Sequence, residues 1–143
     1  MTEIRLTKSR SVGSSYPPYV IAELGSNHNG DMELARKLID SAKRAGADCV
    51  KFQSWSKETI FSKIKYKENF FLADDYRERE DYTLEQIVEE FAISENQLLE
   101  MRDYSHKIGI DFTSTPFSRK EADFLVDELD VDFIKIASMD LNN

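Results

Sequence analysis

Three charged residues lie in or directly after short apolar runs of the sequence. Glu23 follows the first such run, and Lys51 and Lys135 lie within two later ones. An ionised side chain in an apolar strand is costly unless it meets an opposite charge or a bound ion. We therefore treat all three as candidates for chemistry on an anionic ligand, with their side chains aimed at a common face.

Polar residues follow both lysines at short spacing. Lys51 and Gln53 are two residues apart, so their side chains point to the same side of a strand. Lys135 and Ser138 repeat this arrangement on the later run. The repetition favours a functional role over two lysines that merely reach solvent from the ends of their strands.

Other polar groups near these runs leave several roles open. Glu23 is suited to be a general base, an orienting group for a hydroxylated substrate, or the ion-pair partner of a buried lysine. Thr113, Ser114 and Thr115 offer hydroxyl groups that can bind a carboxylate or phosphate. Hydroxyl groups at strand ends also commonly cap the following turn, so alone they are a weak signal.

The sequence offers no metal-ligand spacing. His28 lies in a polar turn, where a hydrogen-bonded role is more common than ligation, and His106 lies near the end of an expected helix, where it complements the helix dipole. The two histidines are far apart, and Cys49 is the only cysteine. We therefore assign no metal ligands, and the lone cysteine excludes an internal disulfide.

Composition restricts the class of protein. The chain has 143 residues, 41% of them hydrophobic, which suffices for one core. Its net charge of −8 and lack of a basic stripe argue against a nucleic-acid partner. Neither a signal-peptide pattern nor a membrane-length apolar run is present, so we expect a cytoplasmic protein without membrane insertion.

Strands and helices alternate along the chain. Apolar runs predict strands at 19–23, 48–53, 110–114 and 132–137, and helical spacing and capping signals predict helices at 32–45, 95–107 and 119–128. Asp31 is the expected N-cap of the first helix, and three further helix starts share a Ser or Thr followed three residues later by Gln or Glu: Thr83 with Gln86, Ser94 with Gln97, and Ser118 with Glu121. This order predicts a parallel sheet with right-handed crossovers.

The fold class follows from the turn after the first strand. An open dinucleotide-binding sheet requires G-x-G-x-x-G, and GSNHNG at 25–30 has only the first and last glycine. We therefore predict an α/β fold of the (β/α)8 TIM-barrel type, with residues 1–17 as an N-terminal extension. Such barrels need about 250 residues, so 18–143 would form only the first half, about four strand–helix units. The aromatic and charged stretch 55–82 covers either the catalytic face or a subunit interface.

Four motifs in order resemble the N-terminal half of the sialic acid synthase family. They are IAELGSNHNG at 21–30, AGADCVKFQ at 45–53, FTSTPF at 112–117, and IKIAS at 134–138 followed by two asparagines. The resemblance covers the chain from about residue 18 to its end. It implies a condensation in which C3 of phosphoenolpyruvate adds to the aldehyde of an N-acetylated amino sugar such as N-acetylmannosamine, water attacks C2, and phosphate leaves.

The same resemblance implies residue roles. Glu23 would be the catalytic carboxylate at the reacting carbons, and Gln53 a contact to the sugar. The phosphoenolpyruvate site would consist of Lys51, Thr113, Thr115, Lys135 and Ser138. Fixed cations and hydroxyl donors of this kind hold an anion in attack geometry and offset the charge that develops.

Several family features would lie outside this chain. The resemblance implies a divalent metal, Mn2+ or Mg2+, held by histidines in the barrel's second half, and a homodimer whose partner supplies an arginine. We therefore expect the chain alone to be inactive. Two alternatives stay open: a legionaminic or pseudaminic acid synthase on the same scaffold, and a non-catalytic module that binds an anion.

Overall fold

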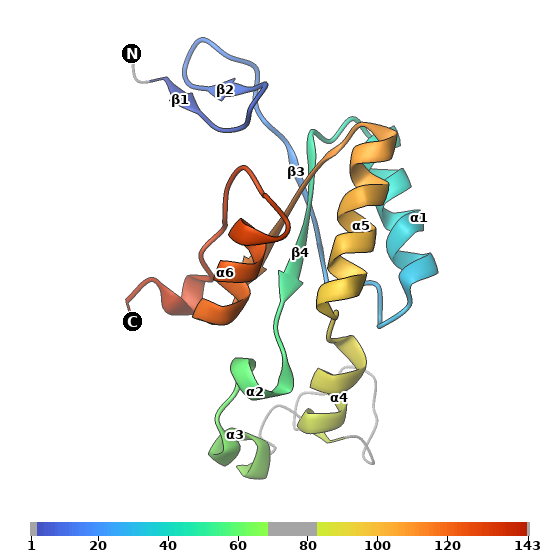
Figure 1. Ribbon diagram of the computed structural model, residues 1–143, viewed down its shortest axis with the longest axis vertical. Coiled ribbons are helices and arrows are strands. Elements are labelled where there is room, and N and C mark those ends of the chain that lie inside the picture. Colours follow the sequence, from blue (N-terminus) through green and yellow to red (C-terminus); the bar gives the residue numbers. More distant parts are fainter. Residues whose placement is uncertain (1–2, 69–82, 143) are drawn as a thin grey trace.

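The protein contains a small hairpin and a parallel sheet with helices against one face (Figure 1). The computed structural model describes residues 3–68 and 83–142. Its strands are β1 (Ile4–Arg5), β2 (Ser11–Val12), β3 (Ile21–Gly25), β4 (Cys49–Ser54) and β5 (Asp111–Pro116). Its α-helices are α1 (Met32–Arg44), α2 (Lys57–Ile60), α3 (Lys63–Glu68), α4 (Leu84–Phe91), α5 (Glu95–Ile108) and α6 (Arg119–Asp127), and a short 3-10 helix covers Ser138–Asp140.

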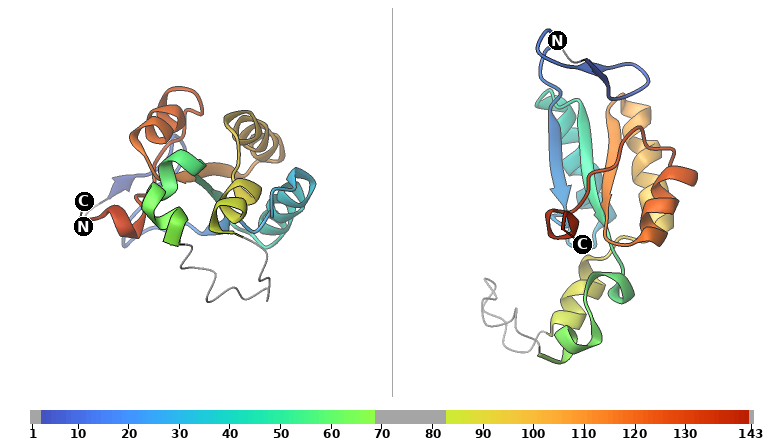
Figure 2. Two further views of the ribbon diagram at one scale, coloured as in Figure 1. Left: turned by 90° about the horizontal axis from the view of Figure 1, so that it is seen from below. Right: turned by 90° about the vertical axis from the view of Figure 1, so that its left-hand side faces the viewer.

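The strands β3, β4 and β5 pair in parallel in this order, as the alternation of elements predicts. Helices α1, α5 and α6 lie around one side of the sheet when it is viewed along its strands (Figure 2, left). The core between these layers is closely packed, because alternate strand residues meet the apolar faces of the helices. Its fully buried members include Val50, Phe52, Ile39, Leu98, Met101 and Leu125.

The two ends of the sheet carry different structures. The β1–β2 hairpin lies beyond the amino ends of the strands, and α2, α3 and α4 lie beyond their carboxyl ends (Figure 1). The expected N-terminal extension is therefore an antiparallel hairpin. The stretch after β4 contains α2 and α3, and its remainder at 69–82 lies outside the described residues.

Most of the expected helix boundaries are confirmed. Asp31 caps α1, and complete capping boxes form at Thr83 and Ser94. The box expected at Ser118 forms only in half: its hydroxyl accepts the N–H of Glu121, but the Glu121 carboxylate bonds elsewhere. No helix in the described ranges is both long and apolar enough to cross a membrane.

The predicted fourth strand is wrong for this structure. Residues 132–137 follow an extended path, yet they make no strand pairing among the described residues. The segment still lies against β5, because the Thr113 hydroxyl donates a hydrogen bond to the carbonyl of Phe133 at 2.6 Å. It therefore runs beside the sheet without extending it.

Candidate active site at the carboxyl edge of the sheet

Strand register brings the first predicted site residues into one row. Glu23 pairs with Lys51 across β3 and β4, and Lys51 pairs with Thr113 across β4 and β5. Gln53 and Thr115 form the next row toward the carboxyl ends. These odd-numbered residues lie on the face opposite the helix layer, since the even-numbered residues of β4 fill the core. The predicted common face is therefore confirmed for Glu23 and Lys51, and Gln53, Thr113 and Thr115 lie on it as well.

Lys51 is the buried centre of this group. Its residue is 7% exposed, and its ammonium forms an ion pair with Oε2 of Glu23 and donates to Oγ1 of Thr115 at 3.2 Å. Gln53 Nε2 in turn donates to Oε1 of Glu23 at 3.4 Å. The ion pair left open by the sequence therefore exists. It satisfies the charge that burial would otherwise make costly.

The two partners of this ion pair differ in their access to solvent. The Lys51 side chain is 9% exposed, whereas that of Glu23 is 48% exposed. The register between β3 and β4 is irregular between Glu23 and Gly25, so regular strand pairing is interrupted directly after Glu23. The carboxylate is therefore the solvent-accessible member of the pair, and the ammonium is the buried one.

Thr113 has a different environment from Thr115. It is fully buried, and its hydroxyl proton is used by the Phe133 carbonyl. Its hydroxyl is thus engaged with the backbone, while Thr115 contacts the Lys51 ammonium directly. Of the two predicted hydroxyl ligands, Thr115 is the better placed for an anion on Lys51.

Lys135 and Ser138 are not brought into this cluster by any described contact. Both residues are exposed, so the expectation that Lys135 is buried in an apolar strand is wrong. The reason is that residues 132–137 do not join the sheet, so no neighbouring strand covers their side chains. Their predicted role in anion binding stays a prediction.

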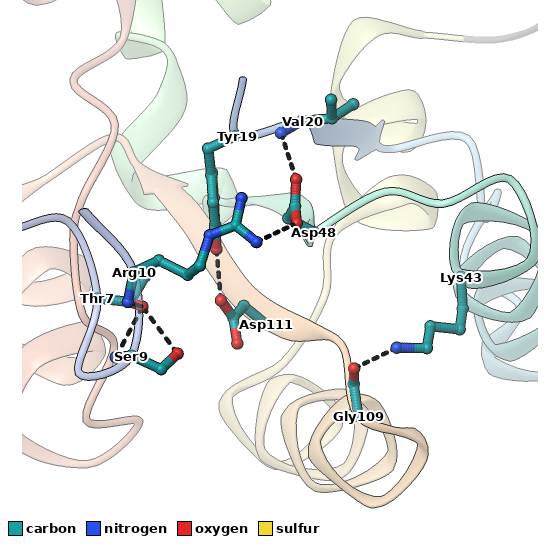
Figure 3. Close-up of polar contacts among 9 residues, drawn as sticks. All are labelled: Thr7, Ser9, Arg10, Tyr19, Val20, Lys43, Asp48, Gly109 and Asp111. Carbon is teal, nitrogen blue, oxygen red and sulfur yellow. Dashed lines mark hydrogen bonds and ion pairs between the residues drawn. The ribbon is translucent and has the colours of Figure 1, made fainter. Parts of the chain in front are cut away.

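The opposite, amino end of the same face is closed by a polar network (Figure 3). The Tyr19 hydroxyl donates to Asp111 at 2.6 Å, and Arg10 forms an ion pair with Asp48 at 3.2 Å and lies over the Tyr19 ring. Burial and the bond to Asp111 raise the pKa of Tyr19, so it stays neutral. Burial also raises the pKa of the Cys49 thiol to about 12, so this cysteine is not a nucleophile at neutral pH.

His28 is a buried turn residue, as the more common interpretation of its sequence position predicts. Its Nδ1 accepts the N–H of Gly30 at 3.0 Å, and its ring packs near Phe52 with centroids 5.9 Å apart. Burial lowers the pKa of His28, so the imidazole is neutral. Its Nε2 is buried and lacks a hydrogen-bond partner within the described ranges.

Three residues near the site were missed by the sequence analysis. Trp55 and Phe117 follow directly after β4 and β5, and their rings meet edge to face. Glu121 contacts the segments that follow both strands. The signal for Trp55 was present in its spacing, since it lies two residues after Gln53 and therefore on the same side of an extended chain.

The described residues do not fit a divalent metal site. Within residues 3–68 and 83–142, no group of three or more His, Cys, Asp or Glu side chains is arranged to hold an ion. Near the site, the Glu23 carboxylate is paired with Lys51. Metal ligation by these residues therefore has no support.

Comparison with known proteins points to one family. The model of the NeuB family matches residues 38–143. The chain is 34% identical to mouse N-acetylneuraminate-9-phosphate synthase over 141 residues, which are 99% of the chain and 38% of the enzyme. It is 35% identical to N,N'-diacetyllegionaminic acid synthase of Legionella pneumophila over 131 residues, which are 92% of the chain and 36% of that enzyme.

The fold agrees with these relatives. The crystal structure of an N-acetylneuraminic acid synthetase from Leptospira borgpetersenii matches with a TM-score of 0.77 at 31% identity, over 97% of this chain and 42% of that one. The chain thus spans well under half the length of the proteins it matches. From the family match and the shared α/β fold, we conclude that the chain belongs to the NeuB family, whose relatives here are sialic, legionaminic and pseudaminic acid synthases.

Proposed function

We propose that the chain is part of an enzyme that condenses phosphoenolpyruvate with an N-acetylated amino sugar to a nonulosonic acid. C3 of phosphoenolpyruvate forms a bond to the sugar's aldehyde carbon, water adds at C2, and phosphate leaves. The observation that carries the proposal is the buried Lys51 ammonium, held between Glu23 and Thr115 at the carboxyl edge of a parallel sheet. This edge is where barrels of this class place their chemistry.

Each site residue has a definite task in this proposal. Lys51 and Thr115 bind the anionic part of phosphoenolpyruvate, and Glu23 moves aside toward solvent, where its exposed side chain is readily hydrated. Released from Lys51, Glu23 lies at the reacting carbons, and Gln53 contacts the sugar. These groups hold the two substrates in attack geometry and offset the developing charge.

Thr113, Lys135 and Ser138 would complete the anion site if residues 132–137 joined the sheet as a strand. Thr113 already contacts the segment 132–137, so a small shift of that segment into the sheet would bring Lys135 beside β5. In a parallel strand at that position, Lys135 would add a second cation to the row of Lys51. This step remains part of the proposal.

The fold itself supports a half-barrel. Ile21 on β3 is 39% exposed, and Ile136 and Met139 after α6 are 53% and 62% exposed. Exposed apolar side chains on the first strand of a parallel sheet and on the segment after its last helix are typical of positions that further strands cover. We propose that residues 18–143 form the first half of a (β/α)8 barrel, with residues 1–17 as the extension at its amino end.

The remaining parts of the proposal concern the whole protein. A divalent ion, Mn2+ or Mg2+, would polarise the sugar aldehyde, and its ligands would come from residues beyond this chain because the described residues do not fit one. The whole protein would be a cytoplasmic homodimer without membrane partners, and the charge of −8 argues against nucleic acid as a partner. The amino sugar is either N-acetylmannosamine-like or the precursor of a legionaminic or pseudaminic acid, since relatives of all three kinds match at 32–35% identity.

A second candidate function is a non-catalytic anion-binding module. It is favoured by one observation: Lys51 is buried and placed for an anion, whereas Lys135 is exposed. Such a module would bind phosphoenolpyruvate and never turn it over.

Titration calorimetry with phosphoenolpyruvate tests the shared anion site. We expect binding by the wild-type chain that is lost in Lys51→Ala and weakened in Lys135→Ala, and retained in Lys43→Ala. Lys43 is a matched control because its ammonium bonds the Gly109 carbonyl at the amino end of the sheet (Figure 3). Binding that is unchanged in Lys51→Ala would contradict the proposed site.

A turnover assay separates the enzyme from the module. Phosphate release from phosphoenolpyruvate is followed with Mn2+ and N-acetylmannosamine, for the chain alone and for the chain joined to the remainder of its reading frame. We expect no release by the chain alone and release by the longer protein. Binding without turnover in the longer protein would replace the synthase by the module.

A further inference from the structure

The site continues beyond the sheet as a pair of aromatic rings. Strand pairing ends one residue before Trp55 on β4 and one residue before Phe117 on β5. The two ring centroids are 5.6 Å apart and the ring planes are 89° apart. Trp55 lies two residues after Gln53 and Phe117 two residues after Thr115, so the pair of rings follows that row at the carboxyl end of the sheet. They are a wall at the rim of the proposed site.

Glu121 connects the chain segments that carry this wall. Its half-buried carboxylate accepts the N–H of Phe117 at 3.1 Å through Oε2, and the hydroxyl of Thr59 through Oε1. Thr59 Oγ1 in turn accepts the N–H of Ser56 at 2.8 Å. One carboxylate thus joins the backbone next to Trp55 with the backbone of Phe117.

This linkage is stronger than a neutral hydrogen bond. A carboxylate acceptor roughly doubles the strength of a bond to a neutral donor. Within the described residues Glu121 forms no ion pair, so both oxygens act on neutral donors of the two rim segments. The bond to Phe117 also explains why the capping box at Ser118 is incomplete.

We infer that Glu121 is a positioning residue, which holds Trp55 and Phe117 as a wall next to Gln53 and Thr115 and so helps to hold a ligand that has reached Lys51. The ligand named here, phosphoenolpyruvate with its sugar partner, rests on the proposed function. The wall itself rests only on the contacts of Glu121.

Trp55 reports on the wall directly, because it is the only tryptophan in the chain. Quenching of its fluorescence by acrylamide measures how open the rim is without any ligand. In Glu121→Ala we expect a quenching constant raised about twofold or more, since two bonds to a charged acceptor are lost and the segment opens locally. Glu121→Gln keeps an oxygen for Phe117 and an amide donor for Thr59, so we expect it to restore wild-type quenching.

Two further variants complete the design. Asp123→Ala is the matched control: it removes a carboxylate from the same helix whose side chain is 64% exposed and pairs only distantly, at 3.8 Å, with Arg119. It should leave quenching unchanged. Thr59→Val keeps the shape and removes the bond to Glu121 together with the bond from the Ser56 N–H, so quenching should also rise. If Glu121→Ala does not fold by circular dichroism, Thr59→Val decides.

Wild-type quenching in both Glu121→Ala and Thr59→Val would overturn the inference. Calorimetry then tests the consequence for binding: phosphoenolpyruvate affinity should fall about tenfold in Glu121→Ala, which corresponds to the loss of about one hydrogen bond. Failure of the wild-type chain to bind phosphoenolpyruvate, with quenching still raised in Glu121→Ala, would contradict the proposed function and support the wall. Wild-type affinity in a folded Glu121→Ala with raised quenching would overturn the inferred role in holding the ligand.

Discussion

The two ends of the sheet use charged side chains in opposite ways. At the amino end, Arg10 and Asp48 pair with each other, and Asp48 also accepts the N–H of Val20 at 2.8 Å (Figure 3). At the carboxyl end, a buried lysine pairs with a glutamate whose side chain is 48% exposed. The first arrangement fixes the backbone between the hairpin and the sheet. The second leaves the partner of the buried cation accessible to solvent, so the two ends should respond differently to substitution.

Lys51→Met gives the largest expected effect and separates ligand binding from stability. The variant should bind phosphoenolpyruvate about a hundredfold more weakly, because removal of one partner of a desolvated charge pair costs about 2–5 kcal/mol. Its free energy of unfolding should change by less than about 1 kcal/mol, since the partner left behind, Glu23, has a side chain that is 48% exposed and can be hydrated. Calorimetry and urea unfolding measure the two quantities. A large loss of stability with normal binding would reverse the contrast between the ends.

Gly30→Ala and Gly46→Ala compare a turn at each end of the sheet. Gly30 (φ +75°) lies at the carboxyl end, where an added Cβ would collide with the backbone carbonyl of Glu90 in α4. Gly46 (φ +86°) lies at the amino end, where a Cβ would meet no atom within 4 Å. Both variants pay about 1–2 kcal/mol for a left-handed residue with a side chain. We expect the free energy of unfolding of Gly30→Ala to fall by about 1–3 kcal/mol more than that of Gly46→Ala because of overpacking, as measured by urea unfolding. Equal losses in the two variants would show that α4 moves away without cost.

Tyr19→Phe should destabilise the amino end alone. It removes a hydrogen bond to the carboxylate of Asp111, worth about 2 kcal/mol because the acceptor is charged. We expect this loss in urea unfolding with phosphoenolpyruvate affinity unchanged. Tyr104→Phe is a suitable control, since it removes a similar bond, to Asp40, between α5 and α1. Weakened ligand binding in Tyr19→Phe would mean that the two ends are coupled.

His28 gives the smallest expected effect, through pH. Burial lowers the pKa of His28 in the folded chain, so below pH 6.5 the unfolded chain takes up a proton that the folded chain does not. The free energy of unfolding should therefore fall as pH is lowered from 7 to 5, by at most about 1.4 kcal/mol per pH unit. His28→Asn, which keeps an acceptor for Gly30, should reduce this slope. Equal slopes in the variant and the wild-type chain would contradict a neutral, buried His28.

Local signals in the sequence predicted local structure well. The N-cap at Asp31, the capping boxes at Thr83 and Ser94, and the parallel pairing of the three central strands all follow from short-range patterns. The convergence of Glu23 with Lys51 also followed, because equal positions on neighbouring parallel strands share one face. The sequence therefore predicted which local elements form and which residues of neighbouring strands share a face.

Features that depend on contacts between segments far apart in the sequence were not predicted. The apolar run 132–137 predicts a strand, but pairing depends on what lies on both sides of it, and its backbone instead meets the Thr113 hydroxyl. The sequence predicted Glu121 only as a capping residue, because its bonds to Phe117 and Thr59 depend on how the segments after β4 and β5 lie next to α6.

The irregular register of β3 has a consequence for engineering. A Cβ at Gly25 would lie 3.1 Å from Nε2 of Gln53 and 3.2 Å from Oε1 of Glu23, closer than ordinary contact. A methyl group there would press against the amide and the carboxylate, and the φ of +49° would strain any residue with a side chain. Because this carboxylate pairs with Lys51, residue 25 is a position from which the geometry of the ion pair can be altered without replacing either partner.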